Sequence, residues 1–572
     1  MKTNTNKPQF QLRRMVVLAV FMLLVVGLLY RALDMQVINQ TFFKQQGDAR
    51  HLRIVPLTAH RGDIYDRNGE PLAISTPVDS VWANPKELQV GADPAKKLAQ
   101  ILDLNQVQLQ NKLNKLSDKE FVYIQRQVSP DTGEQVKSLG LAGVYLQREY
   151  KRFYPTGEVT SHVLGFADID DRGQEGLELA YDDWLRGEPG AKKIMRDRLG
   201  QVIDDVERIR PAEPGRPVHL SIDRRIQYLA YRALKSSVKE HKAIAGSAVV
   251  LNVHTGEVLA MVNQPSFNAN NRSQLRPGVY RNRAVTDVFE PGSTMKPFTI
   301  AAALESGKWH PMDNVHTSPG YYSVQGSAIK DMRDYGKINL SEIILKSSNV
   351  GISKVALSLE QETQLDMYIR LGFGVDTGSG FPGERNGNLR SQRLSDFERA
   401  TMAFGYSLSV TPLQLARAYA AIANGGTVYP VSFLRQDGDI QGDTVMSADT
   451  ARKIRRMMER VVSAEGTAQK AAIANYSVAG KTGTVHKFIS GGYADDRYLS
   501  VFAGMAPASD PQLVMVVMLD EPRNGEYFGG QVAAPVFSKV MSGALRLLDI
   551  QPDNLQYVRR PGNATVTKGK SA

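Results

Sequence analysis

The sequence predicts a membrane-anchored protein of mixed α/β class, in which one spanning helix precedes two folded domains. Near the N-terminus, a run of apolar residues from Met15 to Leu33 contains a single charged residue. The chain has 572 residues, of which 42% are hydrophobic, so it is long and apolar enough for two or three domains. Strand-like runs near residues 218–262 and 476–519 enclose a mainly helical stretch, a pattern that indicates one α/β domain.

The apolar run predicts an uncleaved transmembrane anchor. At about 1.5 Å per residue, its length is close to the thickness of a bilayer's hydrocarbon core. Its single charge, Arg31, lies near one end, where the side chain can reach the interface, and no small-residue cleavage site follows. The residues before the run are basic at Lys2, Lys7, Arg13 and Arg14. We therefore expect residues 1–14 in the cytoplasm, a span at residues 15–34, and the rest of the chain across the membrane.

Residues 35–215 are expected to form an α+β domain. The pair Asn68-Gly69 lies between short apolar runs and predicts a hairpin turn. The Leu-, Gln- and Lys-rich stretch around Ala95–Leu113 predicts amphipathic helices. The Pro-rich segment at residues 210–217 marks a change in composition, and we place the domain boundary there.

Residues 216–552 are expected to form the α/β domain. Asp223 predicts the start of a helix that continues through Leu234, and residues 247–262 predict two strands about a turn. The segment from 284 to 430 is mainly helical in pattern, and strand runs return at residues 476–486, 498–504 and 513–519. The sheet is therefore complete only when these last strands are added. The basic tail at residues 553–572 predicts disorder.

Composition excludes several kinds of site. The chain has no cysteine, which excludes disulfides, thiolate nucleophiles and cysteine-ligated metals. Its nine histidines are scattered and form no His-Glu-x-x-His motif, so we expect neither a metal nor a cofactor. The net charge of +11 is concentrated at the two ends of the chain, so we expect no nucleic-acid partner.

The strongest chemical signal is a serine followed three residues later by a lysine. This spacing occurs at Ser236, Ser293 and Ser327, and chance alone gives on the order of one or two examples in such a chain. Ser293 stands out by its context, because Pro291-Gly292 predicts a turn into a helix whose first turn holds the serine. Residues three apart share a helix face, so Lys296 can reach the Ser293 hydroxyl, and helix-terminal N–H groups can stabilise an oxyanion.

Two later segments add the groups that such a serine needs. Ser347 and Asn349 supply a second hydroxyl and an amide within one short segment. Lys481, Thr482, Gly483 and Thr484 form a strand on which Lys481 and Gly483 point one way and the two threonines the other. Taken alone, each segment has a simpler interpretation, as a helix cap or as the basic end of a strand. Their occurrence together and in this order predicts a serine acyl-transfer site.

These three motifs, S-x-x-K, S-x-N and K-T-G, resemble the active-site motifs of the penicillin-binding proteins. The likeness extends over about residues 50–545 and is closest to class B members. Further similar segments are Arg61–Gly69, Lys151–Pro155, Val163–Phe166, Gly176–Glu178, Phe404–Tyr406, Val410–Gln414 and Tyr527–Gly530. The region before residue 216 shows no likeness to a glycosyltransferase domain, which argues against the bifunctional class A. One departure is Ser407, where the family pattern has a glycine.

The resemblance implies a transpeptidase domain with an antiparallel sheet between helical regions, preceded by an elongated, non-catalytic pedestal of dimerisation type. It implies that Ser293 is the nucleophile, with Lys296, Ser347, Asn349 and Lys481 as further catalytic groups. Substrate-binding residues implied in the same way are Thr482, Gly483, Thr484, Tyr406 and Phe528.

The implied activity is peptidoglycan D,D-transpeptidation during septal wall synthesis. The implied ligands are stem peptides ending in D-alanyl-D-alanine, and β-lactams. The resemblance places the protein in a bacterial inner membrane with its catalytic domain in the periplasm, and its implied partners are a membrane glycosyltransferase and other cell-division proteins. Two alternatives stay open: a carboxypeptidase or β-lactamase of the same fold, and a non-catalytic division scaffold. The sequence offers no carboxylate that can be assigned to activate water, and the intact motifs argue against a scaffold.

Overall fold

The computed structural model describes residues 9–88, 92–196, 202–273, 275–390, 394–489 and 492–555, and the chain divides into two compact units. The first unit consists of Met1–His60, Pro77–Tyr150 and Gly187–Pro214. The second consists of Arg61–Thr76, Lys151–Arg186 and Gly215–Ala572. Two segments that precede the predicted domain boundary thus belong with the second unit, and the boundary itself stays a prediction.

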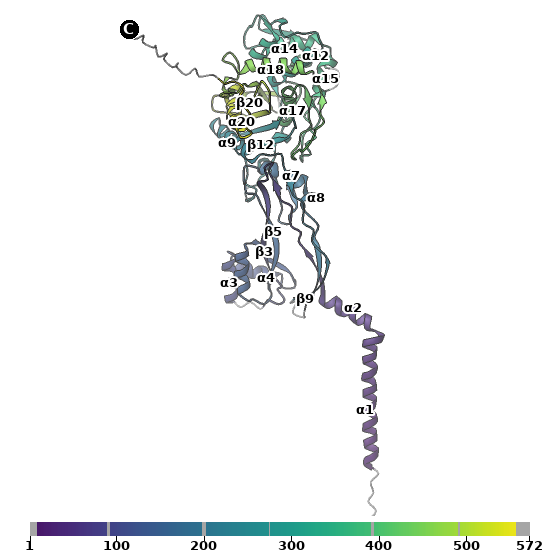
Figure 1. Cartoon of the computed structure of the whole chain (residues 1–572). Helices are drawn as coiled ribbons and strands as arrows, with labels where there is room; N and C mark the ends of the chain where they lie inside the picture. The colour runs from purple at the N-terminus through teal and green to yellow at the C-terminus, as the bar shows by residue number, and fades with distance from the viewer. Residues whose placement is uncertain are drawn as a thin grey trace, which may run out of the picture. The chain divides into compact units, whose positions relative to one another are not determined.

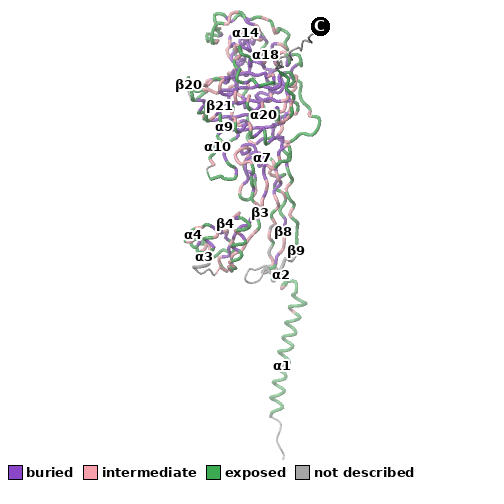
Figure 2. Tube along the Cα trace, turned by 60° about the vertical axis from the view of Figure 1, so that its left-hand side comes forward, coloured by how far each residue is buried: buried purple, intermediate pink, exposed green. Residues whose placement is uncertain are grey.

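The N-terminal segment is helical. Helix α1 (Gln9–Leu33) continues into a short π-helix at Asp34–Ile38, and α2 (Gln40–His51) follows. The stretch Phe10–Ile38 is long and apolar enough to cross a membrane, with a mean hydropathy of 2.5 and none of it buried, as the green trace of α1 in Figure 2 shows. It is the one such helix among the residues described. Lys2 and Lys7 lie outside the described residues, and so does the tail from residue 556 on.

Beyond α1 and α2, the described residues of the first unit form one sheet, part of a second sheet and three further α-helices (Figure 1). Strands β1 (Leu52–Leu57), β8 (Gly190–Arg196) and β9 (Val202–Arg210) form one antiparallel sheet. Strands β3 (Pro71–Ala83), β4 (Val122–Val128) and β5 (Val144–Phe153) belong to the other, beside helices α3 (Ala92–Ile101), α4 (Gln106–Lys115) and α5 (Pro130–Ser138). The amphipathic stretch is two helices because Asp103 is left-handed (φ 51°) and the Asn105 side chain caps α4 by accepting from the Gln108 N–H.

The second unit begins with the predicted hairpin. Strands β2 (Ile64–Tyr65) and β3 pair in antiparallel fashion about Asn68-Gly69, and Gly69 has a φ of +82°. Strand β10 (Val218–His219) pairs with β2 in parallel. The remaining short elements of this part are α6 (Ser161–Leu164), β6 (Phe166–Ala167), β7 (Gly173–Glu175), α7 (Gly176–Ala180) and α8 (Asp182–Leu185).

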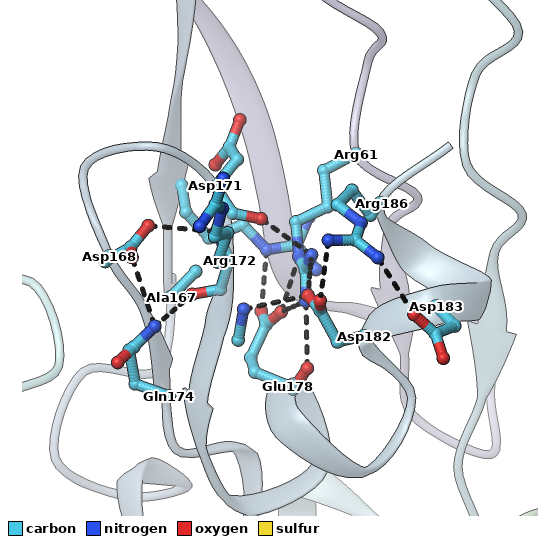
Figure 3. Close-up of polar contacts among 12 residues, drawn as sticks. Arg61, Ala167, Asp168, Asp171, Arg172, Gln174, Glu178, Asp182, Asp183 and Arg186 are labelled. Carbon is cyan, nitrogen blue, oxygen red and sulfur yellow. Dashed lines mark hydrogen bonds and ion pairs between the residues drawn. The ribbon is translucent and has the colours of Figure 1, made fainter. Parts of the chain in front are cut away.

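A buried ion-pair cluster holds these short elements together (Figure 3). The Arg61 guanidinium donates to Glu178 Oε2 at 2.8 Å and to Asp182 Oδ1 at 2.6 Å. Arg61 also donates to the backbone carbonyls of Asp171 and Glu178. The other Glu178 oxygen accepts from Arg152 Nε at 2.7 Å. The side chains of Arg61 and Glu178 are fully buried, so each charge depends on its partner for the solvation that water would otherwise give.

Arg61→Ala is expected to lower the free energy of unfolding by about 3–5 kcal/mol, because it leaves Glu178 buried with one of its two charged partners missing. Urea denaturation of the full-length protein in detergent micelles measures the change. Arg370→Ala is the matched control, because Arg370 pairs with Asp366 outside this cluster, where both side chains are exposed, and it is expected to cost less than about 1 kcal/mol. Equal losses in the two variants would contradict the assignment of the buried cluster as the stabilising one.

A five-stranded antiparallel sheet forms the centre of the second unit, in the order β12-β11-β21-β20-β19. Its strands are β11 (Ala245–Asn252), β12 (Val258–Gln264), β19 (Ala479–Ile489), β20 (Gly492–Ala506) and β21 (Leu513–Asp520). Residues 513–519 of β21 are all buried, which indicates that helices cover both faces. The mixed α/β class and the antiparallel sheet are as predicted.

Helices surround this sheet (Figure 1), and Figure 2 shows the buried residues concentrated there. The longer ones are α9 (Arg224–Glu240), α12 (Lys296–Glu305), α14 (Asn349–Ser358), α15 (Gln361–Arg370), α17 (Pro412–Ala423), α18 (Ala448–Val462) and α20 (Ala534–Leu547). Shorter ones are α10 (Pro277–Tyr280), α11 (Arg283–Thr286), α13 (Leu340–Lys346), α16 (Asp396–Met402) and α19 (Gly529–Val532). The Asp223 cap is confirmed, but α9 runs on to Glu240 rather than ending near Leu234.

The region predicted as mainly helical also contains short strand pairs. Strands β13 (Asn314–His316) and β16 (Lys337–Asn339) form one pair, and β14 (Tyr321–Val324) and β15 (Ser327–Lys330) form a hairpin. A further pair, β17 (Thr427–Val428) with β18 (Asp443–Thr444), follows α17. These strands have only two to four residues, which is too short for a periodic pattern to predict them.

Candidate active site

Ser293 lies in a tight turn that leads into a buried helix. Residues Gly292–Met295 form a 3₁₀ turn, and α12 continues from Lys296 with Pro297 in its first turn, where a missing N–H costs no hydrogen bond. The turn into a helix is therefore as predicted. Ser293 is partly exposed, whereas Lys296 is fully buried.

A glycine from a distant segment packs against this turn. The Gly292 N–H donates to the Gly405 carbonyl at 3.1 Å, and a Cβ at Gly405 would lie 2.2 Å from the Gly292 carbonyl oxygen. The close approach brings Tyr406 next to the Ser293 turn. Ser407, the departure from the family pattern, has a φ of +62°, so it adopts the backbone conformation that the expected glycine would adopt freely.

Ser347 lies between two helices in a left-handed conformation. Helix α13 ends at Ser347 (φ +59°), and α14 starts at Asn349 with Ser348 as its N-cap. A non-glycine residue pays roughly 1–2 kcal/mol for this conformation, so neighbouring contacts must hold it in place. One such contact is the bond that Lys296 Nζ donates to the Ser347 carbonyl at 2.6 Å.

The structure brings the lysines of two motifs onto one hydroxyl. Ser347 Oγ lies 3.1 Å from Lys296 Nζ and 3.0 Å from Lys481 Nζ, and it accepts a hydrogen bond from each. Lys296 Nζ also donates to Asn349 Oδ1 at 2.8 Å. Four of the five predicted catalytic residues thus form one connected network. Among the described residues, no hydrogen bond reaches the Ser293 hydroxyl, although the turn places Ser293 at the start of the helix that carries Lys296.

Both lysines lie in surroundings that disfavour the charged form. Burial, and then the neighbouring charge of Lys481, lower the pKa of Lys296 well below its usual value, while the Asp331 carboxylate acts in the opposite direction. Burial lowers the pKa of Lys481 to about 7. The direction agrees with the expectation from the sequence that burial and a nearby cation would keep Lys296 neutral.

Strand β19 forms the edge of the sheet and carries Lys481, Thr482, Gly483 and Thr484. The Thr484 hydroxyl accepts from the Gly529 N–H at 3.0 Å, which also places the neighbouring Phe528 beside the strand. The Thr482 hydroxyl lies 2.9 Å from that of Thr467. Both threonine hydroxyls are thus held away from Lys481, in agreement with the predicted alternation.

Aromatic rings and a hollow adjoin the strand. Phe528 packs on Tyr527, which stacks on Tyr498 at 4.2 Å between ring centres. A hollow of about 530 Å³ lies beside the strand, and its lining includes Glu290, Ser407, Val485 and Tyr493. Tyr406 packs against Tyr493. The predicted binding residues therefore lie along the same strand edge.

Sequence reasoning missed residues outside the motifs that contact them, among them Thr467 and Asp331. Neither belongs to a motif, and each reaches its partner only through the fold. The other two Ser-x-x-Lys serines occupy different surroundings. Ser236 is exposed on α9, and Ser327 is exposed on β15.

Two family models match the chain. The model of the penicillin binding protein transpeptidase domain matches residues 246–542, and that of the penicillin-binding protein dimerisation domain matches residues 56–220. The chain belongs to the penicillin-binding protein transpeptidase family. The site described above lies within the transpeptidase match, and the Arg61 cluster lies within the dimerisation match.

Several relatives of this chain are named as established or probable peptidoglycan D,D-transpeptidases. A protein of Escherichia coli strain K12 named peptidoglycan D,D-transpeptidase FtsI is 43% identical, over 92% of this chain and 90% of its own length. A Neisseria meningitidis serogroup A protein named probable peptidoglycan D,D-transpeptidase PenA is 43% identical, over 94% and 93%. A Pseudomonas aeruginosa protein named probable peptidoglycan D,D-transpeptidase PbpC is 42% identical, over 95% and 96%.

Solved structures of penicillin-binding proteins are also similar. The transpeptidase domain of penicillin-binding protein 3 from Burkholderia pseudomallei is 42% identical, with a TM-score of 0.54 over 58% of this chain and 97% of that chain. Penicillin-binding protein 3 from Mycobacterium tuberculosis, solved with aztreonam, is 27% identical, with a TM-score of 0.68 over 88% and 100%.

Proposed function

We propose that this protein is a serine-type peptidoglycan D,D-transpeptidase of septal wall synthesis. The observation that carries the proposal is the convergence of Lys296 Nζ and Lys481 Nζ on Ser347 Oγ, with Lys296 at the start of the helix that follows the Ser293 turn. Two buried lysines so close together cannot both hold a full charge at low cost, so one is available as a base. Deprotonation of a serine hydroxyl requires such a group.

In the first half of the reaction, Ser293 Oγ attacks the carbonyl carbon between the two terminal D-alanines of a stem peptide. Neutral Lys296 takes the hydroxyl proton as the ester bond forms. The C–N bond then breaks, and the leaving D-alanine amine receives its proton through Ser347. The backbone N–H groups of Ser293 and Thr484 stabilise the oxyanion, as the family resemblance implies. Catalytic hydrogen bonds often form or shorten only when substrate is bound, so the lack of a hydrogen bond to the Ser293 hydroxyl is compatible with this role.

In the second half, an amine from a neighbouring stem peptide attacks the ester carbonyl, forms the crosslinking amide and restores the Ser293 hydroxyl. Thr482 and Thr484 hold the substrate carboxylate, and Gly483 permits close approach of the peptide to the edge strand. Phe528 and Tyr406 contact the substrate along the same edge. β-Lactams acylate Ser293 in the same way as the stem peptide.

The lifetime of the penicilloyl-enzyme distinguishes the proposed function from two of its alternatives, a β-lactamase and a non-catalytic scaffold. Among the described residues, no carboxylate is hydrogen-bonded to Ser293, Lys296, Ser347 or Lys481, so no carboxylate is in place there to activate water. Mass spectrometry after incubation with benzylpenicillin is expected to find one persistent adduct per chain. Rapid release of hydrolysed penicillin would instead indicate a β-lactamase, and the absence of any adduct would indicate a scaffold.

The proposed location is a bacterial inner membrane, with the N-terminus in the cytoplasm and the catalytic domain in the periplasm. The basic residues before the span support this orientation, and the proposed partners are a membrane glycosyltransferase and other division proteins. Protease added to spheroplasts is expected to digest the large domain and to spare an epitope tag at residue 1. Loss of the tag with survival of the domain would reverse the orientation.

A further inference from the structure

The loop after the β14–β15 hairpin places a carboxylate at the start of α14. Asp331 follows β15 directly, and its N–H donates at 3.0 Å to the carbonyl of Gly320, which precedes β14, so this bond ties the start of the loop to the open end of the hairpin. Asp331 belongs to none of the motifs and has no role in the steps described above.

The Asp331 carboxylate contacts three consecutive residues. Its Oδ1 accepts from the N–H groups of Asn349 and Val350, the latter at 3.0 Å, and its Oδ2 accepts from the Ser348 hydroxyl at 2.6 Å. The same hydroxyl accepts from the Gly351 N–H at 2.8 Å. Asp331 and Ser348 together therefore satisfy the first three N–H groups of α14, which have no partner within the helix.

These contacts fix the two groups that face Lys296. The Asn349 amide is held from both sides, because its Oδ1 accepts from Lys296 Nζ and its Nδ2 donates to the Lys330 carbonyl at 3.1 Å. Ser347, with its left-handed backbone, immediately precedes the clamped residues. A turn held on its C-terminal side by three hydrogen bonds to one carboxylate cannot relax without breaking them.

We propose that Asp331 is a positioning residue for acylation, which orients Asn349 and Ser347 toward Lys296 by clamping α14 and offsets with its negative charge part of the repulsion from Lys481. This inference rests on the proposed function. The charged groups acting on Lys296 are Lys481, from β19, and Asp331, from the loop after β15. They act in opposite directions, because Lys481 lowers the pKa of Lys296 and Asp331 raises it.

Asp331→Asn separates charge from shape. The amide oxygen can still accept from the Asn349 and Val350 N–H groups, whereas the amide nitrogen can only donate to the Ser348 hydroxyl, and the negative charge is lost. Without that charge the pKa of Lys296 falls further. The acid limb of the pH profile, where the acylation rate falls as Lys296 gains its proton, is therefore expected to move to lower pH. The rate on the plateau above this limb is expected to be about 10-fold lower. Asp331→Ala also removes the clamp and is expected to lower the plateau rate by about 100-fold. The measurement is the second-order rate constant for a fluorescent penicillin from pH 5 to 9, on the full-length protein in detergent micelles.

Asp334→Asn is the matched control. Asp334 lies in the same loop, and its carboxylate accepts from the Ser318 hydroxyl and the Gly336 N–H, away from α14. Its acid limb and plateau are expected to match those of the unsubstituted protein. A thermal melt of each variant identifies any that fails to fold, and Asp331→Asn decides the test if Asp331→Ala does not fold.

An acid limb that stays in place in folded Asp331→Asn would overturn the inference, because a purely structural role changes the rate without moving the limb. Failure of the proposed function would give a different result. In that case the unsubstituted protein would form no persistent adduct, or Ser293→Ala would retain labelling, whatever residue stands at position 331.

Discussion

Ser293→Ala is expected to abolish covalent labelling by benzylpenicillin, to below about 10⁻⁴ of the unsubstituted rate, because the removed oxygen is the atom that bonds to the ligand. The loss is expected without a change in thermal stability. Ser293 is partly exposed, and among the described residues its hydroxyl makes no hydrogen bond, so its removal breaks none that stabilises the fold. Peptide mapping of the adduct by mass spectrometry, together with a gel assay with a fluorescent penicillin, measures the result.

Two other serines provide matched controls for this substitution. Ser236 and Ser327 have the same spacing to a following lysine but lie exposed on α9 and β15. Ser236→Ala and Ser327→Ala are expected to label at the unsubstituted rate. An adduct that maps to either of them, or that survives in Ser293→Ala, would show that the wrong serine has been assigned.

Lys296→Ala is expected to slow acylation by about 10³-fold, in line with the usual contribution of a general base. Lys296 Nζ makes three hydrogen bonds, to the Ser347 carbonyl, the Ser347 hydroxyl and Asn349, so its removal also frees the groups it orients. The measurement is the rate constant for penicillin acylation, alongside a thermal melt. Lys354→Ala is the control, because Lys354 lies on α14 and donates to the His316 carbonyl outside the network.

The pH dependence follows from the same two lysines. Burial and the neighbouring charge of Lys481 lower the pKa of Lys296 well below its ordinary value, and burial lowers that of Lys481 to about 7, so the site favours the neutral form of Lys296. Acylation is therefore expected to fall as the pH drops and Lys296 gains its proton. An acylation rate that rises on acidification in the unsubstituted protein would exclude Lys296 as the base.

The sequence was sufficient for the parts of the site that are carried by short-range patterns. Pro291-Gly292 predicts the turn at Ser293, and strand alternation predicts that Lys481 and Thr482 point to opposite sides of β19. The meeting of the motifs could be expected from the family resemblance, but the contact of both lysines with Ser347 Oγ depends on how three distant segments pack.

Other features depended on contacts that no local pattern contains. Asp331 and Thr467 reach their partners from loops and belong to no motif. The break between α3 and α4 depends on a left-handed Asp103 and a capping Asn105, within a stretch whose amphipathic pattern continues across the break. The division into units also differs from sequence order, because residues 61–76 and 151–186 pack with the later part of the chain.

The order of strands in the central sheet has a consequence for biogenesis. Ala245 of β11 pairs with Asp520 of β21, and β21 separates β11 from β20 and β19. Such distant pairings fold slowly, and until they form, the apolar β11 presents an unpaired edge. If the chain is threaded across the membrane from its anchored end, the sheet cannot close before Leu513–Asp520 has emerged. A ribosome that stalls earlier would deliver a chain that already holds Ser293, Lys296 and Ser347 but has no completed sheet, and we expect such a chain to expose apolar surface rather than to act as a weak enzyme.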